Sequence, residues 1–305
     1  RNPTGNWTDN SGGCREEREK MRILLMPNFT KPRTWEVLRE LCGRMEALGL
    51  TAAAVEKDYR PIAGAGIGPV ENAGEDAIRA AEGCDLLLSI GGDGTMIHSA
   101  RHAAQSRRPV VGVNLGRLGF LAQIEPEGLE HYLLCLKEGR YQREGRYAIG
   151  VSRRDTGEEL LPFAINDIVL TKDPGQNLAD FEIFCNGKLI DHYYADGVIF
   201  STPTGSTAYA LSAGGPVLDP ALQAIVMVPI CPHSISIRPI VFHGEKTISI
   251  RSQGALQAIA DGADKAFLPP GQAVTVGRSK LEPEFISFGE NEFFEILTAK
   301  IKQRG

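Results

Sequence analysis

The sequence lacks several features that would place it in a specialised class of protein. No apolar run reaches the roughly 20 residues that a membrane-spanning helix needs, so we expect no membrane partner. Its six cysteines include no Cys-X-X-Cys pair, which argues against a metal cluster or a disulfide framework. Lys and Arg number 33 against 38 Asp and Glu, so no overall positive field attracts nucleic acid. These absences favour a cytoplasmic protein with small-molecule ligands.

The composition is that of an ordinary folded protein with one large or two average domains. Of the 305 residues, 42% are hydrophobic and 23% are charged, which is enough for a sizeable core. Residues 1–20 are polar, rich in Gly and Asn and without periodicity, so we expect a disordered extension there. Met21 precedes the first strand-like run, and this leading segment is open to being an extension, a remnant of cloning or a misplaced start.

The chain between residues 21 and 139 alternates short apolar runs with stretches of helical spacing. Such alternation predicts parallel strands joined by crossover helices. The expected strands are 22–26, 51–55, 85–90 and 110–113; the expected helices are 35–48, 75–81, 95–105 and 129–137, with a loop over 61–69.

From residue 140 to 284 the pattern predicts a mostly antiparallel β domain. The hairpin signal Asn186-Gly187 and other turn formers separate its strands. The expected strands are 147–152, 163–171, 180–185, 188–192, 197–201, 235–237, 247–251, 255–260 and 273–276, with one short helix near 208–211. Residues 294–301 have helical spacing, and we expect the segment from about 285 to 305 to return to the first domain.

The turn Gly91-Gly92-Asp93-Gly94-Thr95 joins a buried-looking strand to a helical pattern. Ligands bind at this edge of open α/β sheets. Glycines let backbone N–H groups approach a phosphate, and the helix start adds a favourable partial charge. A carboxylate here repels phosphate unless a metal or a proton transfer requires it. We therefore predict a phosphoryl-transfer site; the alternative is that Asp93 only caps a helix.

A second informative stretch runs from Asp196 through Thr202-Pro203-Thr204-Gly205-Ser206-Thr207-Ala208-Tyr209. An apolar strand leads into clustered hydroxyls and a helix start, which suit phosphate or ribose oxygens. The alternatives are a surface turn for the loop, a strand-end residue for Asp196, and an ordinary strand-end turn for Asn166-Asp167.

Two histidines share a helix face at His98 and His102. Their i, i+4 spacing is compatible with a metal pair, but no third ligand is evident, so solvent-facing residues are favoured. His98, in the first turns of its helix, is within reach of the predicted site. We expect no metal held by protein side chains.

The order of these motifs resembles that of the NAD kinases. The resemblance rests on the glycine turn, Asn114–Leu121, Asn166-Asp167, the TPTGSTAY loop at 202–209, and Cys231–Pro239, and it spans most of residues 21–290. The glycine turn alone also occurs in diacylglycerol and sphingosine kinases, whereas the TPTGSTAY loop with its preceding Asp-Gly is far more specific.

The resemblance implies a Rossmann-like domain and a β-sandwich-like domain, with NAD bound between them. It implies phosphoryl transfer from ATP, or polyphosphate in some members, to the adenosine-ribose 2′-hydroxyl. Asp93 would be the general base, and Mg²⁺ would arrive with ATP, whose phosphates lie against Gly91, Gly92, Gly94 and Thr95. Arg117 or Lys172 is a candidate to assist. The implied NAD-binding residues are Asp93, Gly94, His98, Asn166, Asp167, Asn177, Tyr194, Asp196, Thr207, Ala208, Tyr209, Ala210, Leu211 and Ser212. Family members tend to be homodimers or homotetramers.

Two positions depart from the family pattern. Asp167 stands where Glu is common, so the ribose contact shifts or passes through water. Ala263 follows Asp261-Gly262 where Gln is frequent, which removes one substrate contact. Two other functions stay open from the sequence: a diacylglycerol-type lipid kinase, and a dinucleotide-binding regulator without catalysis.

Overall fold

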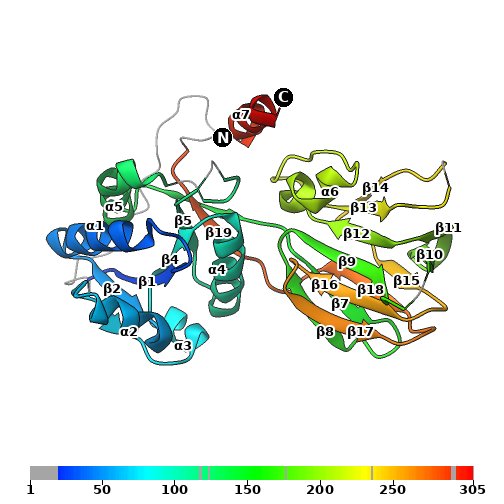
Figure 1. Cartoon of the computed structure of the whole chain (residues 1–305), viewed down its shortest axis with the longest axis horizontal. Coiled ribbons are helices and arrows are strands. Elements are labelled where there is room, and N and C mark those ends of the chain that lie inside the picture. Colours follow the sequence, from blue (N-terminus) through cyan, green and yellow to red (C-terminus); the bar gives the residue numbers. More distant parts are fainter. Residues whose placement is uncertain are drawn as a thin grey trace, which may run out of the picture.

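The computed structural model describes residues 20–116, 119–122, 124–175, 177–234, 236–289 and 293–304, with side chains up to residue 300. Its first half is built on a seven-stranded sheet, sheet A, in the order β3-β2-β1-β4-β5-β19-β6 (Figure 1). All its neighbouring strands are parallel except β19 and β6. The strands are β1 (Arg22–Pro27), β2 (Thr51–Ala54), β3 (Glu71–Asn72), β4 (Leu86–Gly91), β5 (Val110–Asn114), β6 (Gln142–Gly145) and β19 (Glu284–Ser287).

Helices cover both faces of sheet A, which explains why its central strands are apolar at every position. Ile23 and Leu25 of β1 pack with the helices α1 and α5, whereas Leu24 and Met26 pack with α3 and α4. The helices are α1 (Thr34–Ala47), α2 (Glu56–Gly64), α3 (Ala77–Glu82), α4 (Asp93–Ser106), η1 (Pro126–Gly128) and α5 (Leu129–Glu138).

The second half is a sandwich of two antiparallel sheets. Sheet B has the order β11-β10-β15-β18-β7-β8, and sheet C the order β14-β13-β12-β9-β16-β17. Their facing sides form one core, in which Phe181 and Phe200 are fully buried. Sheet B contains β7 (Ile149–Arg153), β8 (Glu159–Ala164), β10 (Ala179–Cys185), β11 (Lys188–Ala195), β15 (Ile248–Arg251) and β18 (Val274–Arg278). Sheet C contains β9 (Asp167–Lys172), β12 (Gly197–Ser201), β13 (Ala224–Ile230), β14 (Ile240–His243), β16 (Leu256–Ala260) and β17 (Asp264–Leu268).

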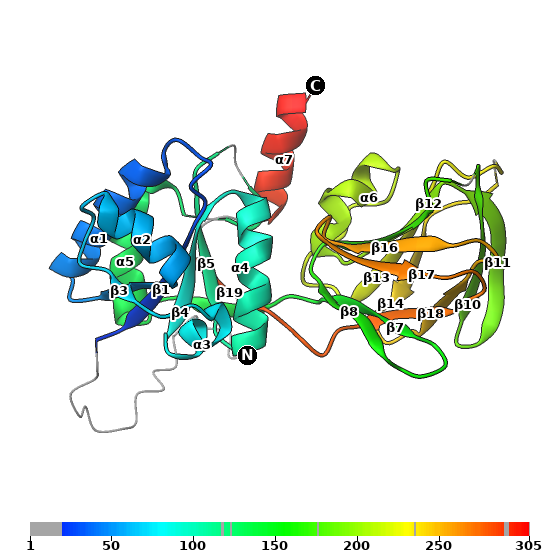
Figure 2. The ribbon, with the colours of Figure 1, turned by 60° about the horizontal axis from the view of Figure 1, so that its bottom comes forward.

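Three further helical segments lie near the boundary between the halves. The 3₁₀ turn η2 (Thr204–Thr207) and the short helix α6 (Tyr209–Ser212) follow β12, and Ala210 packs on the outer face of sheet C. The C-terminal helix α7 (Phe293–Arg304) stands beside the N-terminal end of α4 (Figure 2).

The chain crosses between the halves twice, and the two connections lie side by side. The N–H of Arg146 donates to the Pro283 carbonyl at 3.0 Å, and the N–H of Ser279 donates to the Ala148 carbonyl at 2.9 Å. Residues that are far apart in sequence thus form a single two-stranded link.

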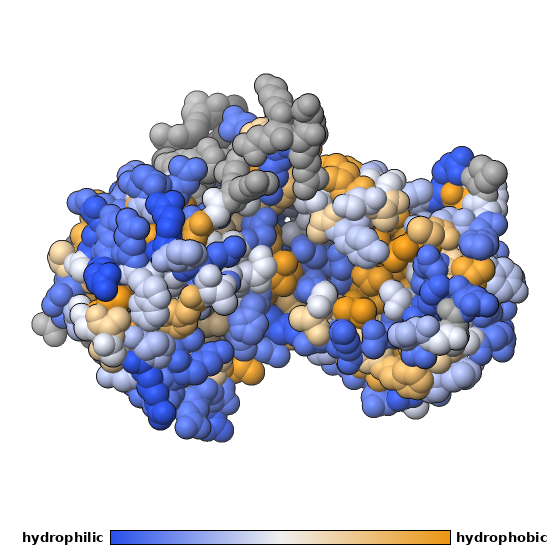
Figure 3. Space-filling model, in the orientation of Figure 1, coloured by the Kyte–Doolittle hydropathy of each residue, from blue (hydrophilic) through white to orange (hydrophobic). Residues whose placement is uncertain are grey.

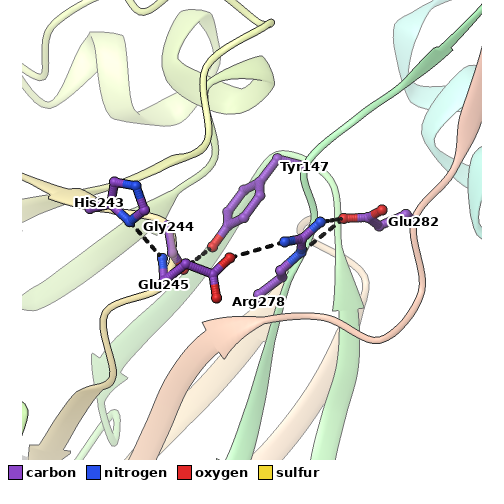
Figure 4. A network of polar contacts seen from close by, with 6 residues as sticks. All are labelled: Tyr147, His243, Gly244, Glu245, Arg278 and Glu282. Carbon is purple, nitrogen blue, oxygen red and sulfur yellow. Dashed lines mark hydrogen bonds and ion pairs between the residues drawn. The ribbon is translucent and has the colours of Figure 1, made fainter.

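A polar network braces this link (Figure 4). Arg278 lies between Glu282 and Glu245 and forms ion pairs with both. Its Nη1 is 3.0 Å from the carboxylate of Glu245. The Tyr147 hydroxyl donates to the Gly244 carbonyl at 2.7 Å. The network ties both connections to the turn between β14 and β15, although such partly exposed ion pairs stabilise by only about 1 kcal/mol or less each.

The fold class predicted from the sequence is confirmed, including the return of the chain to the first sheet through β19. Some elements were predicted wrongly. The expected loop over 61–69 begins inside α2, because burial of Ile62 offsets the hydrogen bond that Pro61 lacks. The expected strand 163–171 is two strands, broken at 165–166 where Asp261 takes the backbone N–H groups.

The pattern also missed strands β3, β6, β13, β17 and β19. Strand β13 is buried on both faces and therefore shows no alternation. At the expected strand 235–237, Ile235 lies outside the described residues, and the strand of that region is β14 instead. The disorder predicted for residues 1–20 concerns residues almost all outside the described chain. Within the described residues, no helix is both long and apolar enough to cross a membrane.

Candidate functional site

The carboxyl edge of sheet A contains the point where the strand order reverses. From β1 the chain moves outward to β2 and β3, then returns to β4 and continues to β5 on the other side. Open α/β sheets bind ligands at this kind of switch point. Asn28 follows β1 there, and its Nδ2 donates to Thr95 Oγ1 at 3.0 Å. The glycine turn after β4 therefore lies at the edge where a ligand is expected.

The glycines of this turn have different physical roles. Gly91 ends β4, and a Cβ there would lie 2.2 Å from Thr95 Oγ1, so close packing requires glycine. Gly92 is the N-cap of α4, and neither it nor Gly94 has an atom within 4 Å of an added Cβ. These two glycines leave open surface beside the first N–H groups of a helix, which lack partners within the helix.

Asp93, the first residue of α4, is held by a second turn that follows β5. Its Oδ2 accepts the N–H of Phe120 at 3.0 Å, and its Oδ1 accepts the N–H of Leu121 at 3.1 Å. A Cβ on Gly119 would lie 2.2 Å from Oδ1, so the turn approaches as closely as glycine allows. The ammonium of Lys300 lies 3.8 Å from Oδ2, and the Asp93 side chain keeps 34% of its surface exposed. The carboxylate is thus both fixed and accessible.

Two contacts join this region to the sandwich. Arg101 of α4 forms an ion pair with Asp264 of β17 and lies 5.7 Å from the ring centre of Phe163. On the other side, Phe120 and Thr204 line one cavity of about 410 Å³ beneath α7. Figure 3 shows the two halves as lobes that meet at a narrower waist. The turn after β5 that binds Asp93 and the TPTGSTAY loop therefore line the same cavity.

Asn166 and Asp167, at the start of β9, are positioned by a third acid from a distant hairpin. The carboxylate of Asp261 accepts N–H groups from Ile165, Asn166 and Asp167 at 3.0, 2.8 and 3.2 Å. Burial raises the pKa of Asp261, against the lowering effect of these bonds. Burial, and then the neighbouring Asp261 charge, raise the pKa of Asp167 to about 7.

The hydroxyls of the TPTGSTAY loop serve mainly to build the loop. Thr202 Oγ1 accepts the N–H of Gly205 at 3.0 Å, and Ser206 Oγ accepts the N–H of Leu218 at 2.9 Å. Both side chains are fully buried. A Cβ on Gly205 would lie 2.0 Å from the Asn166 carbonyl oxygen, so the loop packs directly on the Asn166-Asp167 segment. The hydroxyls of Thr202 and Ser206 are therefore engaged within the loop itself.

The residues after this loop differ in what they can present to a ligand. Tyr209 is exposed, whereas Ala210 is fully buried in the core cluster on the outer face of sheet C. Thr207, Ala208 and Leu211 are half-buried, and Ser212 is exposed.

Asp196 lies with Lys172 and Asn177 at the other end of β9 and β12. Lys172 Nζ is 2.7 Å from Asp196 Oδ1 and donates to the Asn177 carbonyl at 2.7 Å. Tyr194 is exposed on β11, and its carbonyl accepts the N–H of His233 at 2.9 Å. Lys172 is therefore committed to the Asp196 carboxylate and lies away from the contacts that hold Asp93.

His98 and His102 lie one turn apart on α4, with their Nε2 atoms 3.4 Å apart. His98 is exposed and His102 half-buried. Burial lowers the pKa of both, and that of His102 falls to about 4; the charges of Lys57 and Arg101 act in the same direction. The His102 imidazole is thus neutral at neutral pH. In the described part of the chain, no three His, Cys, Asp or Glu side chains gather as a metal site.

Sequence reasoning missed three contributors to the site. Asn28 had a usable signal, since it directly follows the first strand. Asp261 was noticed only as a turn residue, and Lys300 only as part of a helical pattern. Arg117, the other cation considered, lies outside the described residues.

The fold and the site define a nucleotide-binding protein with an acid at the switch point of its parallel sheet. Comparison with known proteins gives the family. The ATP-NAD kinase N-terminal domain matches residues 47–141, and the ATP-NAD kinase C-terminal domain matches residues 165–288. The NAD kinase of Moorella thermoacetica is 36% identical over 287 residues, which are 93% of this chain and 90% of that protein. The NAD kinase of Legionella pneumophila (strain Corby) is 37% identical over 222 residues, covering 71% and 75%.

Solved structures agree with this assignment. A yeast NADH kinase complexed with NADH superposes with a TM-score of 0.83 at 24% identity, covering 94% of this chain and 89% of that one, and supports the fold. An NAD kinase from Archaeoglobus fulgidus in complex with ATP superposes with a TM-score of 0.70 at 25% identity, covering 93% and 100%. The chain belongs to the NAD kinase family, the enzymes that form NADP from NAD and ATP.

Proposed function

We propose that this NAD kinase uses Asp93 as the general base for attack of the adenosine-ribose 2′-hydroxyl of NAD on the γ-phosphorus of ATP. The 2′-oxygen forms a bond to phosphorus, and the bond from phosphorus to the β,γ-bridging oxygen breaks. The electron pair of that bond leaves with ADP, and the hydroxyl proton passes to the Asp93 carboxylate. The main support for this proposal is the Asp93 carboxylate at the switch point, which two backbone N–H groups hold in place and which stays one-third exposed.

The acceptor NAD is proposed to lie between Asp93 and the TPTGSTAY loop. Asn166 and Asp167 suit the ribose hydroxyls, because Asp261 accepts the backbone N–H groups of both residues and so fixes the positions of their side chains. Asp196 and Tyr209 suit the adenine, one by hydrogen bonding and one by its exposed ring. The remaining proposed contacts are Gly94, His98, Asn177, Tyr194, Thr207, Ala208, Ala210, Leu211 and Ser212.

The donor phosphates are proposed to lie against Gly91, Gly92, Gly94 and Thr95, where a helix start favours negative charge. The relative from Archaeoglobus fulgidus holds ATP in its solved structure, which supports ATP over polyphosphate here. Mg²⁺ is proposed to arrive as part of the ATP substrate, bound by phosphate oxygens, which neutralises their charge.

The remaining proposals concern organisation. The Rossmann-like domain is proposed to span 21–139 with about 285–305, and the NAD-binding domain 140–284. A cytoplasmic homodimer or homotetramer is proposed from the family resemblance, with sheet edges as natural contact surfaces.

One assay tests the proposed function. The purified protein is incubated with MgATP and NAD, and NADP is followed with an NADP-dependent dehydrogenase. We expect NADP formation that is lost in Asp93→Asn and kept in the exposed control Asp155→Asn. Turnover that survives in Asp93→Asn would contradict the general base. Binding of NAD without turnover would favour a silent regulator, and phosphorylation of diacylglycerol a lipid kinase.

A further inference from the structure

The C-terminal helix α7 presents one face to the Asp93 region. Phe293, Ile296 and Lys300 recur at helical spacing and therefore share a face. Ile296 is 5% exposed, and the Phe293 ring lies 5.6 Å from the ring of Phe120, the residue whose N–H binds Asp93. The apolar part of this face docks the helix, and Lys300 continues the same face toward the acid.

Lys300 makes two electrostatic contacts at the site. Its Nζ lies 3.8 Å from Asp93 Oδ2 and 3.8 Å from the centre of the Phe120 ring. A ring face attracts an ammonium and so favours this side-chain position. The distance to Asp93 is longer than a direct hydrogen bond, in contrast with the 2.7 Å between Lys172 and Asp196. Lys300 therefore places its charge beside the carboxylate without closing a tight pair on it.

Phosphoryl transfer needs positive charge at this place. Negative charge on the non-bridging oxygens must be stabilised as the γ-phosphoryl group moves from ADP to the ribose oxygen. Among the ion pairs of the described residues, the cation recorded within 4 Å of Asp93 is Lys300. Arg101 and Lys172 pair with Asp264 and Asp196 on the sandwich.

We propose that Lys300 is a further catalytic residue, whose ammonium binds the non-bridging oxygens of the transferring γ-phosphoryl group. The inference rests on the proposed function, because it places that group beside Asp93. The ammonium donates hydrogen bonds and keeps its protons. The bond changes stay as stated above: the 2′-oxygen gains phosphorus, ADP takes the leaving electron pair, and Asp93 takes the proton.

The experiment compares Lys300→Met, Lys300→Arg and the exposed control Lys280→Met on the full chain. We expect kcat to fall about 10²–10³-fold in Lys300→Met, the range for removing one preorganised donor. The KM for ATP should rise, and the KM for NAD should change less than about twofold. Lys300→Arg should recover most of the loss because it restores a charged donor, and Lys280→Met should behave as wild type.

Two parallel measurements separate the possible failures. Binding of a non-hydrolysable ATP analogue with Mg²⁺, followed by calorimetry, should weaken about tenfold or more in Lys300→Met even if turnover is undetectable. Thermal unfolding should be nearly unchanged. Full activity and full ATP-analogue binding in Lys300→Met would overturn the inference about Lys300. The proposed general base would then still be tested separately by Asp93→Asn. Equal losses of activity in Lys300→Met and Lys300→Arg, with a matching drop in melting temperature, would show that Lys300 only helps to dock α7. That result would also overturn the inference.

Discussion

The two lobes of the molecule hold their acids in opposite ways. On the edge of sheet A, Asp93 accepts two backbone N–H groups and stays one-third exposed. At the start of β9, Asp167 is 6% exposed and lies near a second, half-buried acid, Asp261. An accessible, fixed carboxylate suits proton transfer, whereas on the sandwich the Asp261 carboxylate orders the backbone that carries Asp167. The difference teaches that environment, not residue type, assigns a role to each acid.

The strongest test of this comparison removes the proposed base. Asp93→Asn keeps an oxygen acceptor but cannot take a proton at neutral pH, so we expect kcat to fall about 10²–10⁴-fold. NAD binding, measured by calorimetry, should weaken only slightly. A variant that loses NAD binding and turnover together would show that Asp93 holds the substrate instead.

Replacing the buried organiser should act on substrate binding. In Asp261→Asn one amide oxygen replaces the two carboxylate oxygens that accept the three N–H groups, and the new NH₂ group opposes at least one of these donors. We expect the KM for NAD to rise roughly tenfold and the free energy of unfolding to drop by about 2 kcal/mol. Steady-state kinetics and urea unfolding measure the two effects. An unchanged KM for NAD would show that Asp261 does not contribute to NAD binding.

The buried pair should also make stability depend on pH. Because the pKa of Asp167 is raised to about 7, the native state keeps a proton that the unfolded chain releases near pH 4. The free energy of unfolding should therefore fall as pH rises from about 4 to 7, by about 1.4 kcal/mol per unit for one proton.

Asp167→Asn removes this proton, so its urea-unfolding free energy should fall less steeply than that of wild type across the same window. Asp155→Asn, an exposed control, should keep the wild-type slope. Equal slopes in wild type and Asp167→Asn would mean that Asp167 is not the titrating group.

The smallest expected effect concerns the tie between the lobes. Arg101→Met removes the ion pair to Asp264 and the contact with the Phe163 ring. Since both ion-pair partners are partly exposed, we expect a stability loss of about 1 kcal/mol or less. NADP formation should slow a few-fold. A loss as large as that in Asp261→Asn would make the tie a main determinant of the site.

Local patterns predicted much of the fold and part of the site. The strand before Gly91 and the helix after it follow from a buried run, glycine conformational freedom and helical spacing. Strand β13 was missed because burial on both faces removes alternation. Helix α2 was missed because a proline such as Pro61 usually ends a helix. The helix continues past Pro61 because Ile62 is buried, which the local sequence does not show.

Contacts between distant parts of the chain were beyond local patterns. Asp261 accepts backbone N–H groups about 95 residues earlier in the chain. No local sequence pattern near either segment predicts this contact. Lys300 meets Asp93 only because α7 docks across from Phe120. The hydroxyls of Thr202 and Ser206 show the reverse case, in which a composition typical of ligand binding builds a loop instead.

The most direct test is a crystal structure of the enzyme with NAD and a non-hydrolysable ATP analogue. The account predicts an Asp93 carboxylate oxygen within about 2.6–3.2 Å of the adenosine-ribose 2′-oxygen, with the same 2′-oxygen facing the γ-phosphorus of the analogue. A ribose whose 2′-hydroxyl points away from Asp93, toward another acid or toward solvent, would contradict it.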